Sequence, residues 1–79
     1  MIMNNLEHLK VEADAFVKEE KTVIVENHNL KKTYKIIGYD GLGEFQAELQ
    51  NVDDDADIIR IGLPGVIKAI KKNEILKYG

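Results

Sequence analysis

Residues 33–51 constrain the fold of this chain most strongly, because they have the pattern of a β-hairpin. Two runs rich in strand-forming residues, TYKIIGY and EFQAELQN, flank the segment DGLG. Its Asp-Gly step is typical of hairpin turns, since glycine adopts positive φ without steric cost. In the second run, Phe45, Ala47 and Leu49 alternate with polar residues. This period of two predicts a strand with one buried face and one solvated face.

Further strands are predicted on both sides of this hairpin. Residues 21–26 (KTVIVE) are rich in β-branched side chains, which favours a strand, and the following Asn-His-Asn segment favours a turn. Residues 21–51 therefore predict a three-stranded antiparallel meander. Residues 58–63 (IIRIGL) fit a fourth strand or a short helix equally well, since both are consistent with a short apolar run.

A helix is predicted at each end of the meander. The first helix is predicted over residues 5–20. Asn4, directly before it, is a suitable N-cap, and Glu7 completes a pattern like a capping box. A second helix is predicted to begin near Pro64, a residue that suits the first helical turn, and to end at Asn73. Each segment has one apolar stripe. The stripes consist of Leu6, Leu9, Ala13, Phe16 and Val17 in the first helix, and of Leu63, Val66, Ile67 and Ile70 in the second.

These elements predict a single α+β domain over residues 1–79, with the order α-β-β-β-(β)-α. We expect both helices to pack on the face of the meander that carries Phe45, Ala47 and Leu49. Residues 74–79 lie out of phase with the second helix and are predicted to form a tail or a short strand. A chain of 79 residues is near the lower size limit for a single apolar core, so association with a partner is plausible.

The composition restricts the chemistry available to the chain. It has no Cys and no Ser, so disulfides, thiolate mechanisms and serine nucleophiles are excluded. His8 and His28 lack the helical spacing of a metal site. The segment VDDDAD resembles the start of a calcium-binding loop, but Ile58 and Pro64 occupy the positions of the required Gly and Glu. The sequence predicts a non-enzymatic protein without metal or cofactor.

The sequence also predicts a location and an origin. No apolar run approaches the roughly 18 residues of a membrane span, and the N-terminus lacks the layout of a signal peptide. We therefore expect a cytoplasmic protein that does not interact with membranes. Ten Lys and ten Ile against one Arg indicate an AT-rich genome of bacterial or phage origin.

The main functional prediction is a binding surface for another protein or for a second copy of the chain. Simple alternation along residues 33–39 places Ile37 and Tyr39 on the face opposite Phe45 and Leu49. Ile24 is expected on that same face, so Ile24, Ile37 and Tyr39 predict an apolar patch that the core does not need. Such a module is expected to act as a small regulator or inhibitor encoded by a phage, plasmid or bacterial chromosome. An alternative is a self-associating structural subunit that uses the same patch, for example in a homodimer.

Nucleic-acid binding is the alternative, because the charges are unevenly distributed. Residues 1–57 have a formal charge of −7 (six Lys against thirteen Asp and Glu), whereas residues 58–79 have +4 (one Arg and four Lys against one Glu). The predicted basic surface consists of Lys68, Lys71, Lys72 and Lys77. The chain as a whole is acidic, with a net charge of −3, and only Arg60 offers a bidentate phosphate contact. Protein binding is therefore favoured.

Overall fold

A computed structural model gives the structure of residues 5–40 and 45–78. Along the chain the elements are α1 (Asn5–Lys18), β1 (Thr22–Asn27), β2 (Leu30–Asp40), β3 (Gln46–Asn51), β4 (Asp54–Gly62), α2 (Leu63–Lys72) and β5 (Leu76–Lys77). Within these residues the strands form one five-stranded sheet in the order β4-β3-β2-β1-β5. Strands β1 to β4 form an antiparallel meander, and β5 pairs with β1 in parallel. The predicted α+β class is confirmed.

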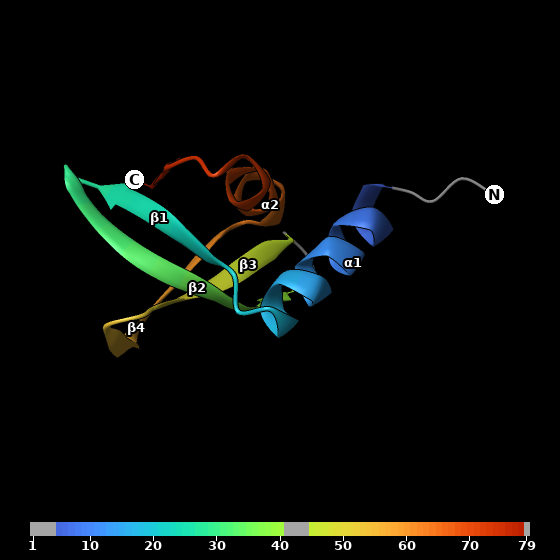
Figure 1. The fold of residues 1–79 in the computed structure, drawn as a ribbon, viewed down its shortest axis with the longest axis horizontal. Coiled ribbons are helices and arrows are strands. Elements are labelled where there is room, and N and C mark those ends of the chain that lie inside the picture. Colours follow the sequence, from blue (N-terminus) through green and yellow to red (C-terminus); the bar gives the residue numbers. More distant parts are fainter. Residues whose placement is uncertain (1–4, 41–44, 79) are drawn as a thin grey trace.

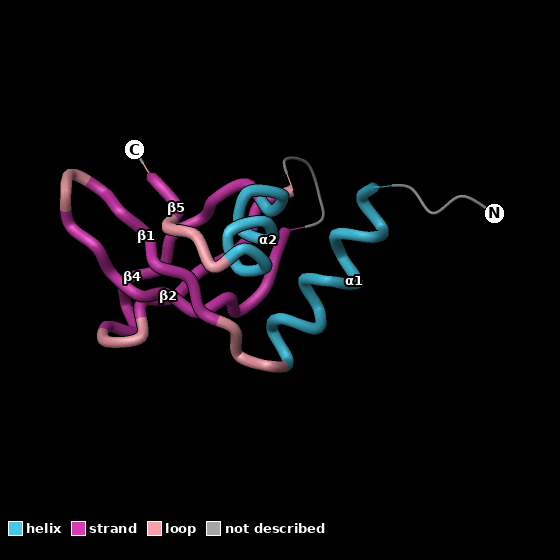
Figure 2. Tube along the Cα trace, turned by 45° about the horizontal axis from the view of Figure 1, so that its top comes forward, coloured by secondary structure: helices cyan, strands magenta, loops and turns pink. Residues whose placement is uncertain are grey.

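Both helices cover the same face of the sheet, but they do not cover all of it. Helix α2 lies across the sheet and α1 crosses one end of it (Figure 1). The β1–β2 and β3–β4 turns lie at the opposite end, away from α1, as Figure 2 also shows. Within the part of the chain that the structure describes, the strand ends near the two turns have no helix above them.

The core forms where the alternating apolar residues of the strands meet the apolar stripes of the helices. Ala47 and Leu49 of β3 have no exposed surface, as predicted from the alternation. The buried apolar residues are Ala13, Val23, Val25, Tyr34, Ile36, Ala47, Leu49, Leu63, Val66, Ile67 and Ala69. Leu9, Phe16 and Val17 of α1 pack against them while partly exposed. The predicted packing of both helices on the Ala47 and Leu49 face is confirmed.

The turn between β1 and β2 has the geometry of a tight hairpin. His28 and Asn29 separate Asn27 from Leu30, which are paired across the two strands, and both turn residues have positive φ, 52° and 66°. Two successive residues of positive φ are the requirement of a type I′ turn, whose twist matches that of the flanking strands. The predicted turn at residues 27–29 is confirmed. The Asp-Gly turn of the central hairpin and the Asn4 cap lie outside the described residues.

A β-bulge at Ile37 changes the side on which the end of β2 presents its residues. Ile36 pairs with Leu49 and the next pair is Gly38 with Glu48, so Ile37 has no partner on β3. One extra residue reverses the inward and outward alternation of everything that follows it. Tyr39 therefore pairs with Ala47 and packs against the core. The prediction that Tyr39 lies on the face opposite the helices is wrong.

The acidic segment after β3 is a turn followed by an edge strand. Asn51 Oδ1 accepts a hydrogen bond from the backbone N–H of Asp53 at 2.8 Å, which closes the turn. Asp54 then pairs with Asn51, but the next pair is Ile58 with Gln50, so residues 55–57 form a bulge of three residues without partners on β3. Residues 58–62 continue as strand up to Gly62, which resolves the choice between strand and helix.

Helix α2 closes the fold. It begins at Leu63 with Pro64 in the first turn and ends at Asn73, a left-handed C-cap with φ 55° and ψ 45°. The left-handed residue redirects the chain, so that β5 reaches the free edge of β1. The backbone N–H of Tyr78 donates a hydrogen bond to the carbonyl oxygen of Glu26 at 2.8 Å, which holds the C-terminal end of the described chain beside β1.

Candidate functional site

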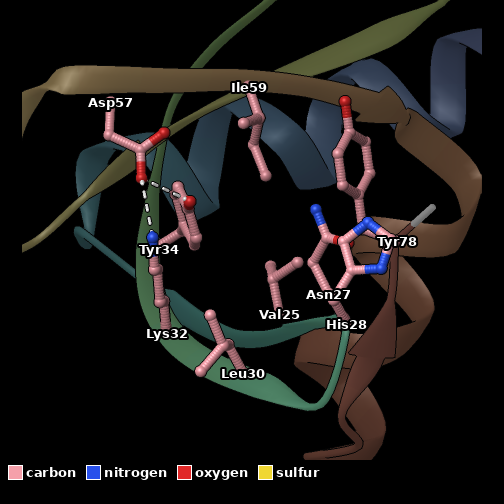
Figure 3. Close-up of a pocket in the computed structure, with 9 residues that line it drawn as sticks. All are labelled: Val25, Asn27, His28, Leu30, Lys32, Tyr34, Asp57, Ile59 and Tyr78. Carbon is pink, nitrogen blue, oxygen red and sulfur yellow. Dashed lines mark hydrogen bonds and ion pairs between the residues drawn. The ribbon is translucent and has the colours of Figure 1, made fainter.

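The end of the sheet near the two turns contains a cavity of about 200 Å³. Its side chains come from β1, β2, β4 and the segment after β5, and they surround a common central space (Figure 3). The lining residues are Val25, Asn27, His28, Leu30, Lys32, Tyr34, Asp57, Ile59 and Tyr78. Apolar and polar groups thus share one preformed hollow, the usual character of a binding site.

The cavity continues the face of the sheet that forms the core. Val25 and Tyr34 are buried core residues, and each has a polar neighbour on the same face of the sheet. For Tyr34 that neighbour is Lys32, two residues earlier on β2. Val25 pairs with Lys32, and Asn27 follows Val25 on the same side of β1. Polar residues are tolerated there because neither of the described helices, α1 and α2, covers this part of the face, as Figure 1 shows. The side chains that face the core elsewhere in the sheet therefore line a solvent-accessible site here.

Asp57 is the most firmly held charged group in the cavity. Its Oδ2 accepts hydrogen bonds from the Tyr34 hydroxyl at 2.6 Å and from Asn51 Nδ2 at 3.1 Å, and Lys32 Nζ lies 4.0 Å from the same oxygen. The hydrogen bonds from Tyr34 and Asn51 lower the pKa of Asp57 from its ordinary value of 3.8, and the charge of Lys32 adds to the effect. The other carboxylate oxygen points toward Ile59 and the cavity interior (Figure 3). The cavity thus contains an ionised, oriented carboxylate.

Tyr34 connects this carboxylate to the core. The residue is 5% exposed, and burial, followed by the hydrogen bond to Asp57, raises the pKa of its hydroxyl to about 12. The hydroxyl therefore stays protonated and donates to Asp57 over the whole physiological pH range. Because Tyr34 belongs to β2 and Asp57 to the bulge of β4, this bond also fixes the bulge across the intervening strand β3.

We expect Tyr34→Phe to lower the free energy of unfolding at pH 7 and to weaken its pH dependence. Asp57 has a lowered pKa, so its stabilisation is present above 3.8 and is lost as the pH falls through the folded-state value. Tyr34 has a raised pKa, so its stabilisation is present below 10.0 and is lost as the pH rises towards about 12. The variant lacks the shared hydrogen bond, and its stability curve should approach that of the wild type at both extremes. Urea denaturation across this pH range measures the difference.

Tyr78→Phe is the matched control for this experiment, since its hydroxyl lies across the cavity from Asp57 (Figure 3). This variant should keep the acid-side pH dependence of the wild type. On the alkaline side a small difference is expected, because the charge of Tyr78 contributes to the raised pKa of Tyr34. A constant stability difference between wild type and Tyr34→Phe at every pH would contradict the assigned hydrogen bond.

The opposite wall contains an unsatisfied acceptor and an apolar rim. Asn27 Oδ1 is buried and has no hydrogen-bond partner among the described residues. Leu30 is 63% exposed and Tyr78 is 38% exposed, and both line the cavity. Exposed apolar side chains beside a hollow are typical of surfaces that contact another molecule.

The residues of the predicted protein-binding patch do not form one surface. Ile24 is 43% exposed on the uncovered face of the sheet, where it pairs with Thr33. Ile37 occupies the bulge and is only partly exposed. Tyr39 lies on the other face, and its hydroxyl is hydrogen bonded to Asp14 of α1. The bulge at Ile37 separates these residues, because it turns Tyr39 to the core face, and simple alternation does not predict it.

The four lysines predicted as a nucleic-acid surface separate into two places. Lys68, Lys71 and Lys72 line an open groove between α1 and α2 whose floor includes Leu9 and Ile67. Lys77 lies on β5 and lines a different hollow with Glu26 and Tyr78. Lys71 Nζ also pairs with Glu12 Oε1 at 3.0 Å, so part of the positive charge in the groove is neutralised by α1.

No group of three or more metal-ligating His, Cys, Asp or Glu residues is assembled within residues 5–40 and 45–78. In the same part of the chain, no helix is long and apolar enough to cross a membrane.

The sequence patterns do not predict the cavity. The chain places Asn27, Leu30 and Lys32 on the core-facing side of β1 and β2, and a polar residue at such a position is the one local indication of a site. Asp57 gives no comparable indication, because the three-residue bulge of β4 decides which way its side chain points. Tyr78 joins the site only through the parallel pairing of β5 with β1.

The fold and the cavity define a small α+β domain with a preformed, partly polar binding hollow at one end of its sheet. Comparison with protein-family models, with curated proteins and with solved structures gives no match to this chain. The candidate function therefore depends on the chemistry and geometry of the site.

Proposed function

We propose that this protein is a non-enzymatic protein-binding module that contacts its partner with the cavity end of the sheet. The observation that carries the proposal is the uncovered part of the core-facing surface, where a hollow whose walls include the buried Val25 and Tyr34 has an exposed apolar rim. The partner is another protein or a second copy of the chain. We further propose that the module is a small cytoplasmic regulator or inhibitor of bacterial, plasmid or phage origin.

The size of the cavity supports a macromolecular partner. A volume of about 200 Å³ is smaller than the range of about 300–1,000 Å³ that is usual for small-molecule sites. It suffices for one side chain inserted from a larger surface. Leu30 and Tyr78 on the rim would contact the neighbouring atoms of that surface, and Tyr is among the residues enriched at interfaces.

Nucleic-acid binding by α2 is the weaker candidate. Lys68 and Lys72 are exposed on the groove, but Lys71 is paired with Glu12 and Lys77 lies in a different hollow. A phosphate backbone usually needs several cations along one continuous surface, and this arrangement does not provide it.

We expect Leu30→Asp to weaken binding of the partner at least about tenfold, because the substitution places an unpaired charge on the apolar rim that the partner would cover. Affinity purification from the organism that encodes the chain, followed by mass spectrometry, would identify proteins retained by the wild type. Binding of each purified candidate to wild type and variant would then be measured by calorimetry. Light scattering of the isolated protein would detect a second copy as the partner.

Ile24→Asp is the matched control, since Ile24 is also an exposed apolar residue of the same hairpin but lies on the other face of the sheet. It should bind the partner as the wild type does. A partner lost with Ile24→Asp and kept with Leu30→Asp would place the interface on the uncovered face and overturn the proposal.

A further inference from the structure

The cavity has the chemistry of a receptor for a positively charged side chain. Its one firmly held charge is the carboxylate of Asp57, which the hydrogen bonds from Tyr34 and Asn51 orient. Both bonds fall on Oδ2, whereas the other oxygen points into the cavity (Figure 3). An ionised oxygen directed into a hollow with apolar walls favours a cationic occupant.

The remaining walls suit the other parts of such a side chain. Val25 and Ile59 lie on opposite sides of the central space and would contact an aliphatic stem (Figure 3). Asn27 Oδ1 is buried without a hydrogen-bond partner among the described residues. The amide can therefore turn this oxygen towards a donor on the ligand without breaking a hydrogen bond that the oxygen already accepts. The cavity thus supplies a second acceptor and an apolar channel in addition to the carboxylate.

The charge around the cavity also favours a basic partner. The turn and bulge that carry Asp57 also contain Asp53, Asp54 and Asp55, all of them exposed. Exposed carboxylates beside the cavity accelerate the association of a basic surface.

Lys32 would compete with an incoming cation for the carboxylate of Asp57. Its Nζ lies 4.0 Å from Oδ2, a long distance for an ion pair, and its side chain is 52% exposed. Exposed pairs of this type contribute little stability, so an incoming cation can displace Lys32 at small cost.

We propose that the cavity binds a lysine or arginine side chain of the partner protein, with its charged group on the inward-facing oxygen of Asp57 and its stem between Val25 and Ile59. This inference rests on the protein-binding function proposed above and specifies the chemistry of the partner. Because Oδ2 already accepts two hydrogen bonds, the bidentate fork of arginine has only one oxygen available. Lysine and arginine should therefore bind with similar affinity.

The test uses a probe that does not require the partner. The ¹⁵N-labelled protein is titrated with Nα-acetyl-lysine methylamide and, as the uncharged comparison, with Nα-acetyl-norleucine methylamide. The lysine probe should shift the amide resonances of cavity residues such as Asn27, Leu30 and Ile59, and the norleucine probe should bind at least tenfold more weakly. Equal binding of the two probes, or shifts located in the groove between α1 and α2, would overturn the proposal.

Three variants separate the specific contact from the general acidity of the turn. Asp57→Asn should weaken binding of the lysine probe at least tenfold, whereas Asp55→Asn, which removes the same charge two residues away, should change it less than threefold. Lys32→Gln removes the competing cation and should strengthen binding severalfold. This last variant keeps the test valid if Asp57→Asn fails to fold, and unchanged or weaker binding to it would contradict the proposal.

The two proposals can fail separately. If an identified partner depends on Leu30 but binds Asp57→Asn as tightly as the wild type, the cationic occupant is wrong and the protein-binding function stands. If the lysine probe binds in the cavity while the purified partner binds Leu30→Asp as tightly as the wild type, the proposed interface is wrong and the cation site stands.

Discussion

Leu49→Ala is expected to lower the free energy of unfolding by about 3 kcal/mol, near the middle of the range for buried leucines. Leu49 has no exposed surface and lies on the central part of the sheet, paired with Ile36 on one side and Ile59 on the other. Truncation leaves a void among residues from three strands, and those strands cannot all move to fill it. A chain of 79 residues has a total stability of roughly 4–12 kcal/mol, so the variant should be only marginally folded at 37 °C.

Urea denaturation followed by circular dichroism measures this loss, and thermal denaturation should show a midpoint roughly 12–24 °C lower. Ile58→Ala is the control on the neighbouring strand, since Ile58 is 49% exposed on the uncovered face. It should cost less than about 1 kcal/mol. Equal losses for the two variants would mean that the helices do not cover the Leu49 face.

The elements of this fold are predictable from the sequence because their patterns are local. The alternation around Ala47 and Leu49 identifies a strand with one buried face, and the left-handed preference of His28 and Asn29 places a turn. Asn73 ends α2 for the same reason. Each pattern depends on a few consecutive residues, so no knowledge of the tertiary structure is needed.

The candidate site is not predictable in this way, because it depends on irregular pairing between strands. Tyr34 and Asp57 are separated by 23 residues and meet only because residues 55–57 bulge from β4. The bulge at Ile37 has the opposite effect and removes Tyr39 from the surface where alternation places it. The isolated glycine Gly38, directly after Ile37, is a local indication of the first bulge. Nothing in residues 55–57 marks the second bulge, which is stabilised by the contacts that it allows elsewhere.

Tyr39→Glu tests the consequence of the Ile37 bulge and should lower the free energy of unfolding by about 3 kcal/mol. The aromatic ring packs against the core, and burial followed by the hydrogen bond to Asp14 raises the pKa of its hydroxyl. Glutamate loses the apolar contact of the ring and places a second carboxylate beside Asp14. If the bulge were absent, the same substitution would lie on the uncovered face of the sheet and would be nearly neutral.

Ile24→Glu is the matched comparison for Tyr39→Glu. Alternation predicts that Ile24 and Tyr39 share one apolar patch, but only Tyr39 faces the helices. Ile24 is 43% exposed, so this change should cost no more than about 1 kcal/mol. Tyr39→Phe keeps the ring and removes only the bond to Asp14, so it should cost about 1 kcal/mol and show that ring burial dominates. Similar losses for Tyr39→Glu and Ile24→Glu would place the two residues in equivalent environments and contradict the bulge. A large loss confined to Tyr39→Glu would establish that Tyr39 stabilises the fold and is unavailable to a partner, which leaves the cavity end as the surface to test.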